Sequence, residues 1–94
     1  MADIQHEQNE TGGRYVMALN GAEAELTYRN AGEGRIVADH TLVPGAMRGQ
    51  GVAAQLVDRL IADARDRNWK IVPACSYVAA AFKRHPDWAD LRAD

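Results

Sequence analysis

The residues best suited to chemistry stand at positions 48–51, where an arginine and two glycines separate two structured segments. A strand-like run, residues 34–43, ends at Pro44, and a long amphipathic helix is expected to begin near Gly49. The first N–H groups of a helix have no internal acceptor and carry the positive end of its dipole. Glycine lets the main chain approach an anion, and Arg48 adds a charge suited to phosphate. The stretch predicts an anion site, with a turn whose glycines serve geometry alone as the alternative.

Two common nucleotide-binding patterns do not fit this stretch. The pattern G-x-G-x-x-G fails because Ala54 stands where a third glycine should follow Gly49 and Gly51, and no acidic residue ends a following strand. The pattern G-x-x-x-x-G-K-[ST] fails because no lysine follows either glycine. We therefore expect neither a dinucleotide fold nor a P-loop.

The pattern that does fit is Arg48-x-x-Gly51-x-Ala53, preceded by Val43-Pro44. It resembles the pyrophosphate loop of the GNAT N-acetyltransferase superfamily, which reads Gln/Arg-x-x-Gly-x-Gly/Ala after a strand. A second match, PACSYV at 73–78 followed by Phe82 and HPDW at 85–88, is similar to a short GNAT branch with a Cys-x-Tyr-Val box. That branch has three residues between Phe and His-Pro, whereas this chain has two. The resemblance covers roughly residues 14–88.

The first half of the chain alternates apolar and polar side chains, which is typical of half-buried strands. Strands are expected at residues 14–19, 22–29 and 35–43, joined as an antiparallel three-stranded meander with a hairpin turn at Asn20-Gly21. Residues 1–9 are either a disordered tail or the lead-in to a strand.

The second half adds a crossover. Residues 49–67 carry an apolar stripe at helical spacing, with Asn68 as the stop, and residues 69–75 form a strand that should run parallel to the third. A short helix at 77–84, capped by Ser76, and a last turn at 87–91 follow. The fold class is α/β (α+β), and the order β-β-β-α-β-α resembles a GNAT core that lacks its first strand and helices.

The composition is that of an ordinary globular domain, with 94 residues, 47% of them hydrophobic and 26% charged. We expect one domain over residues 1–94, with 1–12 as a flexible tail at most. A net charge of −2 excludes the basic footprint of a general nucleic-acid binder, and no apolar run is long enough to span a membrane. The single cysteine suits a reducing cytoplasm. His6, Cys75 and His85 lack the spacing of metal ligands, so no metal is expected.

The GNAT resemblance implies where acetyl-CoA would bind. It would lie between two splayed parallel strands, residues 35–43 and 69–74, with its pantetheine arm along the main chain of Leu42 and Val43. The pyrophosphate would be held by the main-chain N–H groups of Arg48, Gly49, Gln50, Gly51, Val52 and Ala53. A main-chain N–H near His40 or Thr41 would polarise the thioester carbonyl.

Two side chains are candidates for catalysis. Cys75 follows a parallel strand at its carboxyl end, where it either faces the thioester, as nucleophile or proton-transfer group, or is a small buried hydrophobe. His40 is expected to share a face with Ala38 and Leu42, and is either a general base for an amine or a packed core histidine. Tyr77 is a weaker candidate for the acid that protonates the departing thiolate.

These interpretations lead to one main function and two others. The main one is an acetyl-CoA-dependent N-acyltransferase that acts on an unidentified amine. One alternative is a CoA-binding module without efficient catalysis that acts through a partner, and the other is a small fold with no cofactor. The sequence names neither the acceptor nor the oligomeric state.

Overall fold

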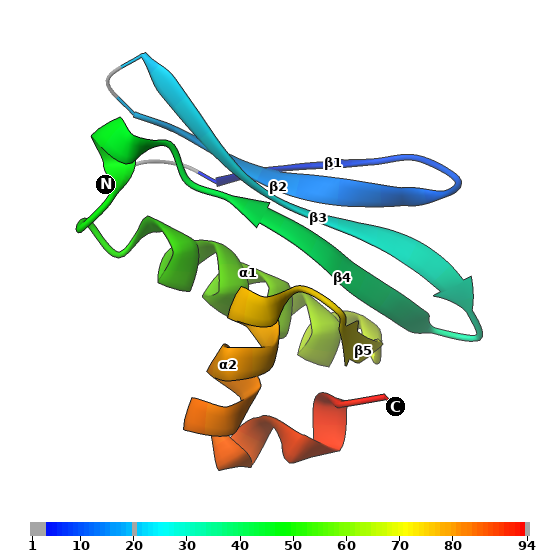
Figure 1. Ribbon diagram of the computed structural model, residues 1–94. Coiled ribbons are helices and arrows are strands. Elements are labelled where there is room, and N and C mark those ends of the chain that lie inside the picture. The colour runs from blue at the N-terminus through cyan, green and yellow to red at the C-terminus, as the bar shows by residue number, and fades with distance from the viewer. Residues whose placement is uncertain (1–3, 20, 94) are drawn as a thin grey trace.

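The computed structural model describes residues 4–19 and 21–93 (Figure 1). Its centre is a five-stranded sheet in the order β1-β2-β3-β4-β5. The strands are β1 (Ile4–Gln8), β2 (Gly12–Leu19), β3 (Ala22–Gly32), β4 (Arg35–Leu42) and β5 (Lys70–Pro73). The first four strands pair antiparallel with their neighbours, whereas β4 and β5 pair in parallel. These pairings agree with the predicted order, apart from β1, which extends the sheet by one strand.

Two helices, α1 (Val52–Arg67) and α2 (Ser76–Arg84), lie on the same side of the sheet and make a second layer (Figure 1). Short 3₁₀ turns, Gly45–Met47 and Pro86–Leu91, precede α1 and follow α2. The predicted apolar stripe of α1 is confirmed, because Leu56, Leu60 and Ala64 are each 0% exposed. Burying one leucine in this way contributes roughly 1.5–3 kcal/mol. Asn68 ends the helix in the left-handed conformation, with φ of 58°, as predicted.

Several element boundaries differ from the sequence prediction. The α1 helix begins at Val52 rather than at 49, so residues 48–51 remain in the connection that leads to it. The β4 strand ends at Leu42, one residue early, and β5 ends at Pro73, which has no N–H to continue a ladder. The prediction that Ser76 caps α2 is wrong, because the cap position is Cys75 and Ser76 is already helical.

Residues 4–8 and 12 lie in strands within the range where the sequence predicted a tail. Residues 4–8 form β1 and pair with β2 from Ile4↔Met17 to Gln8↔Gly13, which corrects the expectation of a flexible tail over that range. Residues 9–11 connect β1 to β2, which begins at Gly12, and residues 1–3 lie outside the described residues. The predicted hairpin joins Leu19 to Ala22, with Gly21 at φ of 78°, while its Asn20 also lies outside the described residues.

A β-bulge in β4 changes which side chains face the helices. Thr27 pairs with His40, whereas the next residue, Tyr28, pairs with Ala38, so Asp39 is an extra residue on β4. Because strand side chains alternate with period two, one inserted residue reverses the faces of every residue after it. The prediction that His40 and Leu42 share the face of Ala38 is therefore wrong.

Candidate functional site

The parallel strands β4 and β5 separate after their fourth pair of residues. Their register runs from Arg35↔Lys70 to Ala38↔Pro73, and a final hydrogen bond from the N–H of Cys75 to the carbonyl of Ala38 measures 2.8 Å. After this point β4 continues to Leu42, while the other chain turns into α2. The sheet therefore opens between β4 and the start of α2, as the resemblance implied for residues 35–43 and 69–74.

A hollow of about 330 Å³ lies where the sheet opens. Residues from the end of β4, the loop before α1, the first turn of α1 and the start of α2 line it: Thr41, Val43, Met47, Arg48, Gly49, Gly51, Val52, Ala53, Ala54 and Tyr77. Most of the residues predicted to bind the cofactor therefore come together. Leu42 points elsewhere, with its side chain 49% exposed, and the side chain of Gln50 donates to the carbonyl of Ala46 at 3.3 Å. The sequence interpretation missed Met47 and Ala54.

A larger hollow, of about 660 Å³, lies along the turn between β1 and β2 and the neighbouring part of β3. Arg14, on its wall, is already paired with Glu7 and Glu25 at 2.9 and 2.7 Å. No helix N-terminus opens on this hollow among the residues that line it. The smaller hollow is therefore the one with chemistry suited to an anion.

The N-terminus of α1 is open to an anion. Gly51 is the cap residue, with φ of 69°, and makes no side-chain capping bond, and the first turn contains no acidic residue. A Cβ added to Gly49 or Gly51 would meet nothing within 4 Å. These glycines therefore set the backbone conformation and leave open space in front of the first helical N–H groups. The N–H of Arg48 already donates to the carbonyl of Gly45 at 3.2 Å, so its exposed guanidinium is the group left for a ligand.

Cys75 is half-buried at the cap position of α2, and its Sγ lies 3.3 Å from Oγ1 of Thr41. Burial raises the pKa of the thiol, but hydrogen bonds from the Thr41 hydroxyl and the N–H groups of Val78 and Tyr77 outweigh it, so the pKa lies below its ordinary value. The bulge at Asp39 is what turns Thr41 toward this sulfur. Thr41 thus joins Cys75 to the wall of the hollow.

His40 lies on the other face of the sheet from Cys75. Its side chain is exposed, and its partner on β3 is Thr27, whose hydroxyl donates to Oδ1 of Asp39 at 2.6 Å. The structure therefore does not bring the two catalytic candidates together on one side. His40 instead flanks the end of β4 from the face that carries no helix in Figure 1.

Over residues 4–19 and 21–93, no group of at least three His, Cys, Asp or Glu side chains is placed to hold a metal ion. Within the same ranges, no helix has the length and hydropathy that crossing a bilayer requires.

A family model described as GCN5-related N-acetyl-transferase matches residues 14–91. The chain belongs to this family, the GNAT acetyltransferases. A solved structure of a Staphylococcus aureus protein assigned as a GCN5-like N-acetyltransferase is similar, with 29% identity and a TM-score of 0.72. That match covers 99% of this chain and 91% of the other. Acetyl transfer from acetyl-CoA is the general reaction of the family, so this GNAT chain is an acetyltransferase by class.

A second solved structure is similar in fold. It is the ribosomal-protein-alanine N-acetyltransferase from Brucella melitensis biovar Abortus 2308, with 18% identity and a TM-score of 0.60. The match covers 93% of this chain and 65% of that one. It supports the GNAT fold of the sheet and helices, while the Cys-x-Tyr-Val box at 75–78 stays a prediction.

Proposed function

We propose that this GNAT chain transfers the acetyl group of acetyl-CoA to an amine, with the cofactor in the hollow of about 330 Å³. The observation that carries the proposal is the uncapped N-terminus of α1, which opens on that hollow beside the parting of β4 and β5. An anion is stabilised there by main-chain N–H groups and the helix dipole together.

The residues around the hollow fit the parts of acetyl-CoA. The N–H groups of the turn and first helical residues, from Gly49 to Ala53, suit the pyrophosphate, and the guanidinium of Arg48 adds a charge-assisted contact. The main chain of Leu42 and Val43 suits the pantetheine arm, which would lie along the open side of β4 as an added strand. When bound, acetyl-CoA supplies an acetyl group activated as a thioester.

We assign separate tasks to the residues at the opening. A main-chain N–H near His40 or Thr41 polarises the thioester carbonyl, an assignment supported by the position of Thr41 on the wall of the hollow. Cys75, whose thiol pKa is lowered, contacts the hydroxyl of Thr41. His40 is placed on the opposite face, from which an amine could approach without crossing the hollow. In this arrangement His40 takes the proton that the amine must lose, and the amine attacks directly while Cys75 lines the site.

The test combines binding and turnover. Acetyl-CoA at 100 times its Kd stabilises a folded protein by about 2.7 kcal/mol, which is a rise of roughly 10 °C or more in Tm for a chain of this size. Release of CoA is then followed with a panel of primary amines. No change in Tm at millimolar acetyl-CoA would contradict the proposal, and binding without transfer to any amine would favour a CoA-binding module.

The same preparation separates direct transfer from a covalent route. Incubation with acetyl-CoA alone should leave the mass of the intact protein unchanged if the amine attacks directly. A mass gain of one acetyl group that disappears in Cys75→Ala would instead make Cys75 the nucleophile.

A further inference from the structure

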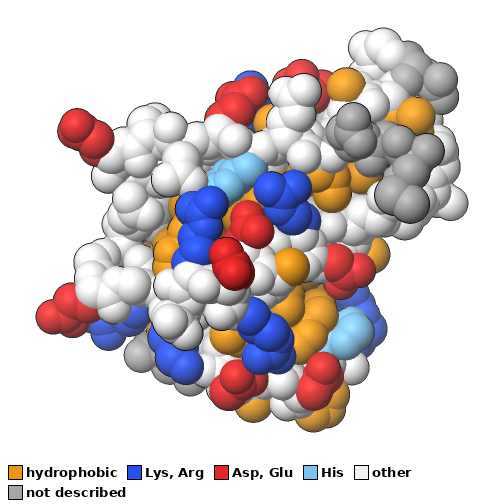
Figure 2. Space-filling model, turned by 180° about the vertical axis from the view of Figure 1, so that it is seen from behind, with side chains coloured by type: hydrophobic (Ala, Val, Ile, Leu, Met, Phe, Trp, Pro, Cys, Tyr) orange, Lys and Arg blue, Asp and Glu red, His pale blue; other side chains and the backbone are white. Residues whose placement is uncertain are grey.

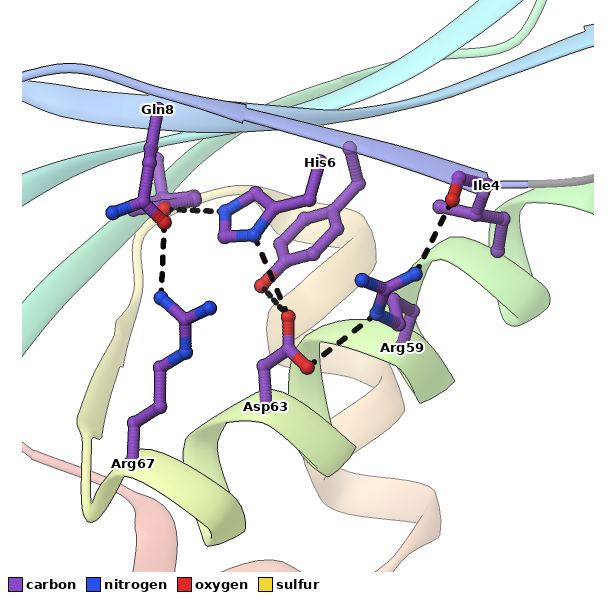
Figure 3. Close-up of polar contacts among 8 residues, drawn as sticks. Ile4, His6, Gln8, Arg59, Asp63 and Arg67 are labelled. Carbon is purple, nitrogen blue, oxygen red and sulfur yellow. Dashed lines mark hydrogen bonds and ion pairs between the residues drawn. The ribbon is translucent and has the colours of Figure 1, made fainter.

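The edge strand β1 is joined to α1 by a row of polar contacts. Partners recur every second residue on β1 and every fourth residue on α1, and the pairs are Ile4 with Arg59, His6 with Asp63 and Gln8 with Arg67 (Figure 3). Two strand residues span roughly 6.6 Å and four helical residues about 6 Å, so the two rows stay in register. The outer contacts are hydrogen bonds of 3.2 and 2.9 Å, both donated by an arginine.

His6, at the centre of this row, is nearly enclosed, with its side chain 7% exposed. Its ring stacks on Tyr15 with centroids 4.3 Å apart, and it forms a T-shaped pair with the ring of Trp69, with centroids 6.4 Å apart. Its Nε2 is 2.7 Å from the hydroxyl of Tyr28, and its Nδ1 is 3.7 Å from Oδ2 of Asp63. One neutral tautomer suits both partners, with Nδ1–H toward the carboxylate and Nε2 accepting from the tyrosine.

A second proton on the ring would disturb this arrangement. Nε2 would become a donor, so the hydroxyl of Tyr28 would have to turn and accept. The carboxylate of Asp63 is already shared, because it accepts from the hydroxyl of Tyr15 at 2.8 Å and from Nε of Arg59 at 3.4 Å.

The charged groups around His6 have opposite effects on its pKa. Burial lowers the pKa of His6, Asp63 raises it, and Arg67 and Arg59 lower it, so the pKa lies below its ordinary value. The groups that pack on the ring from β2 and β3, Tyr15 and Tyr28, are uncharged at neutral pH, and burial raises the pKa of each further. The lowering of the His6 pKa by burial and by the two arginines is therefore larger than the raising by Asp63.

We propose that His6 is a pH-sensitive latch, which fastens the edge strand β1 to α1 near neutral pH and releases the strand when its imidazole gains a proton. In the released strand His6 is exposed to water and titrates near 6.5. Because the docked ring titrates lower, docking is fully stable above that pH and weakens as the pH falls through and below it. Release uncovers the hydrogen-bonding edge of β2. Among the described residues, none of those that join β1 to α1 in Figure 3 lines the hollow proposed for acetyl-CoA. This inference is therefore independent of the proposed function.

Figure 2 shows Lys or Arg side chains and Asp or Glu side chains gathered together on the face seen there. Next to His6, the side chain of Arg59 is 38% exposed and that of Asp63 is 18% exposed. The charged side chains next to His6 are Arg59, Asp63 and Arg67, all from α1. Water therefore reaches the rim of the cluster, and a proton can enter from solvent once β1 loosens.

Amide hydrogen exchange measures the latch directly. At pH 5 the main-chain amides of β1 should lose protection relative to pH 7.5, after correction for intrinsic exchange, while those of α1 and β4 keep theirs. Each unit by which the docked pKa of His6 is below the released one raises the opening equilibrium about tenfold at full protonation. His6→Gln keeps an acceptor for Tyr28 but cannot titrate, so its β1 protection should not depend on pH. The matched control, His40→Gln, removes an exposed histidine and should keep the wild-type dependence.

Two results would overturn the latch. One is a pKa for His6 at or above about 6.5, measured by NMR titration of the wild-type ring, a measurement that decides the matter even if His6→Gln does not fold. The other is a folded His6→Gln protein whose β1 amides lose protection at pH 5 as the wild type does.

Discussion

Replacing Gly51 with alanine separates the conformational role of this glycine from its role in binding. Gly51 has φ of 69°, and an added Cβ would meet nothing within 4 Å. The folded protein therefore loses only the cost of a left-handed residue, about 1–2 kcal/mol. Each kcal/mol lowers the Tm of a chain of this size by roughly 4–8 °C. In the complex, the same Cβ would stand between the first N–H groups of α1 and the pyrophosphate. Losing one charge-assisted hydrogen bond costs about 1.5–3 kcal/mol, which weakens acetyl-CoA roughly 10- to 150-fold.

The control is Gly32→Ala. Gly32 has φ of 82° and is equally open, with nothing within 4 Å of an added Cβ, but it lies at the end of β3 and does not line the hollow. Both variants should lose similar stability in thermal melts, and only Gly51→Ala should lose affinity in calorimetric titrations. The reasoning is refuted if Gly51→Ala binds acetyl-CoA as the wild type does, or if Gly32→Ala loses as much affinity.

Three further changes test other parts of the structure. Thr41→Val removes the hydroxyl that bonds Cys75, so the thiol pKa should rise and alkylation by iodoacetamide at pH 7 should slow; an unchanged rate would show that this bond does not activate the thiol. His40→Gln should lower kcat on an accepted amine and leave the Kd of acetyl-CoA unchanged, whereas an unchanged kcat would remove His40 from proton transfer. Gly12→Ala places a Cβ onto a carbonyl oxygen of β3 and should lower the free energy of unfolding in urea by about 1–3 kcal/mol. Its control, Gly45→Ala, places a Cβ in open space and should change that free energy by no more than about 0.5 kcal/mol. Equal losses of stability in the two variants would contradict the close packing of Gly12.

Local patterns were enough to predict most of the fold. The apolar stripe of α1 depends only on helical spacing, and Asn68 carries its own stop signal. Most of the residues that meet at the hollow were predicted from the resemblance of residues 48–53 to the GNAT pyrophosphate loop, and the glycines before a helix supported an anion site there. Tyr77 lines the hollow from α2, a position that depends on how α2 packs, and its role as a general acid stays a prediction.

The features that could not be predicted depend on contacts between distant segments. The β1 strand has no apolar alternation to reveal it, because its inward side chains at His6 and Gln8 are polar and bind α1. At the bulge, β4 has one residue, Asp39, more than the paired part of β3. Nothing in the sequence of β4 alone specifies this extra residue. That single residue reversed the expected faces of Thr41 and His40.

The measurement that tests the central claim most directly is a titration of the amide NMR spectrum with acetyl-CoA. If the cofactor occupies the proposed hollow, the largest shifts occur at the amides of residues 49–53 and 41–43, and those around the larger hollow, at residues 11–14, change little. Shifts concentrated at residues 11–14, or none up to millimolar acetyl-CoA, would contradict the account.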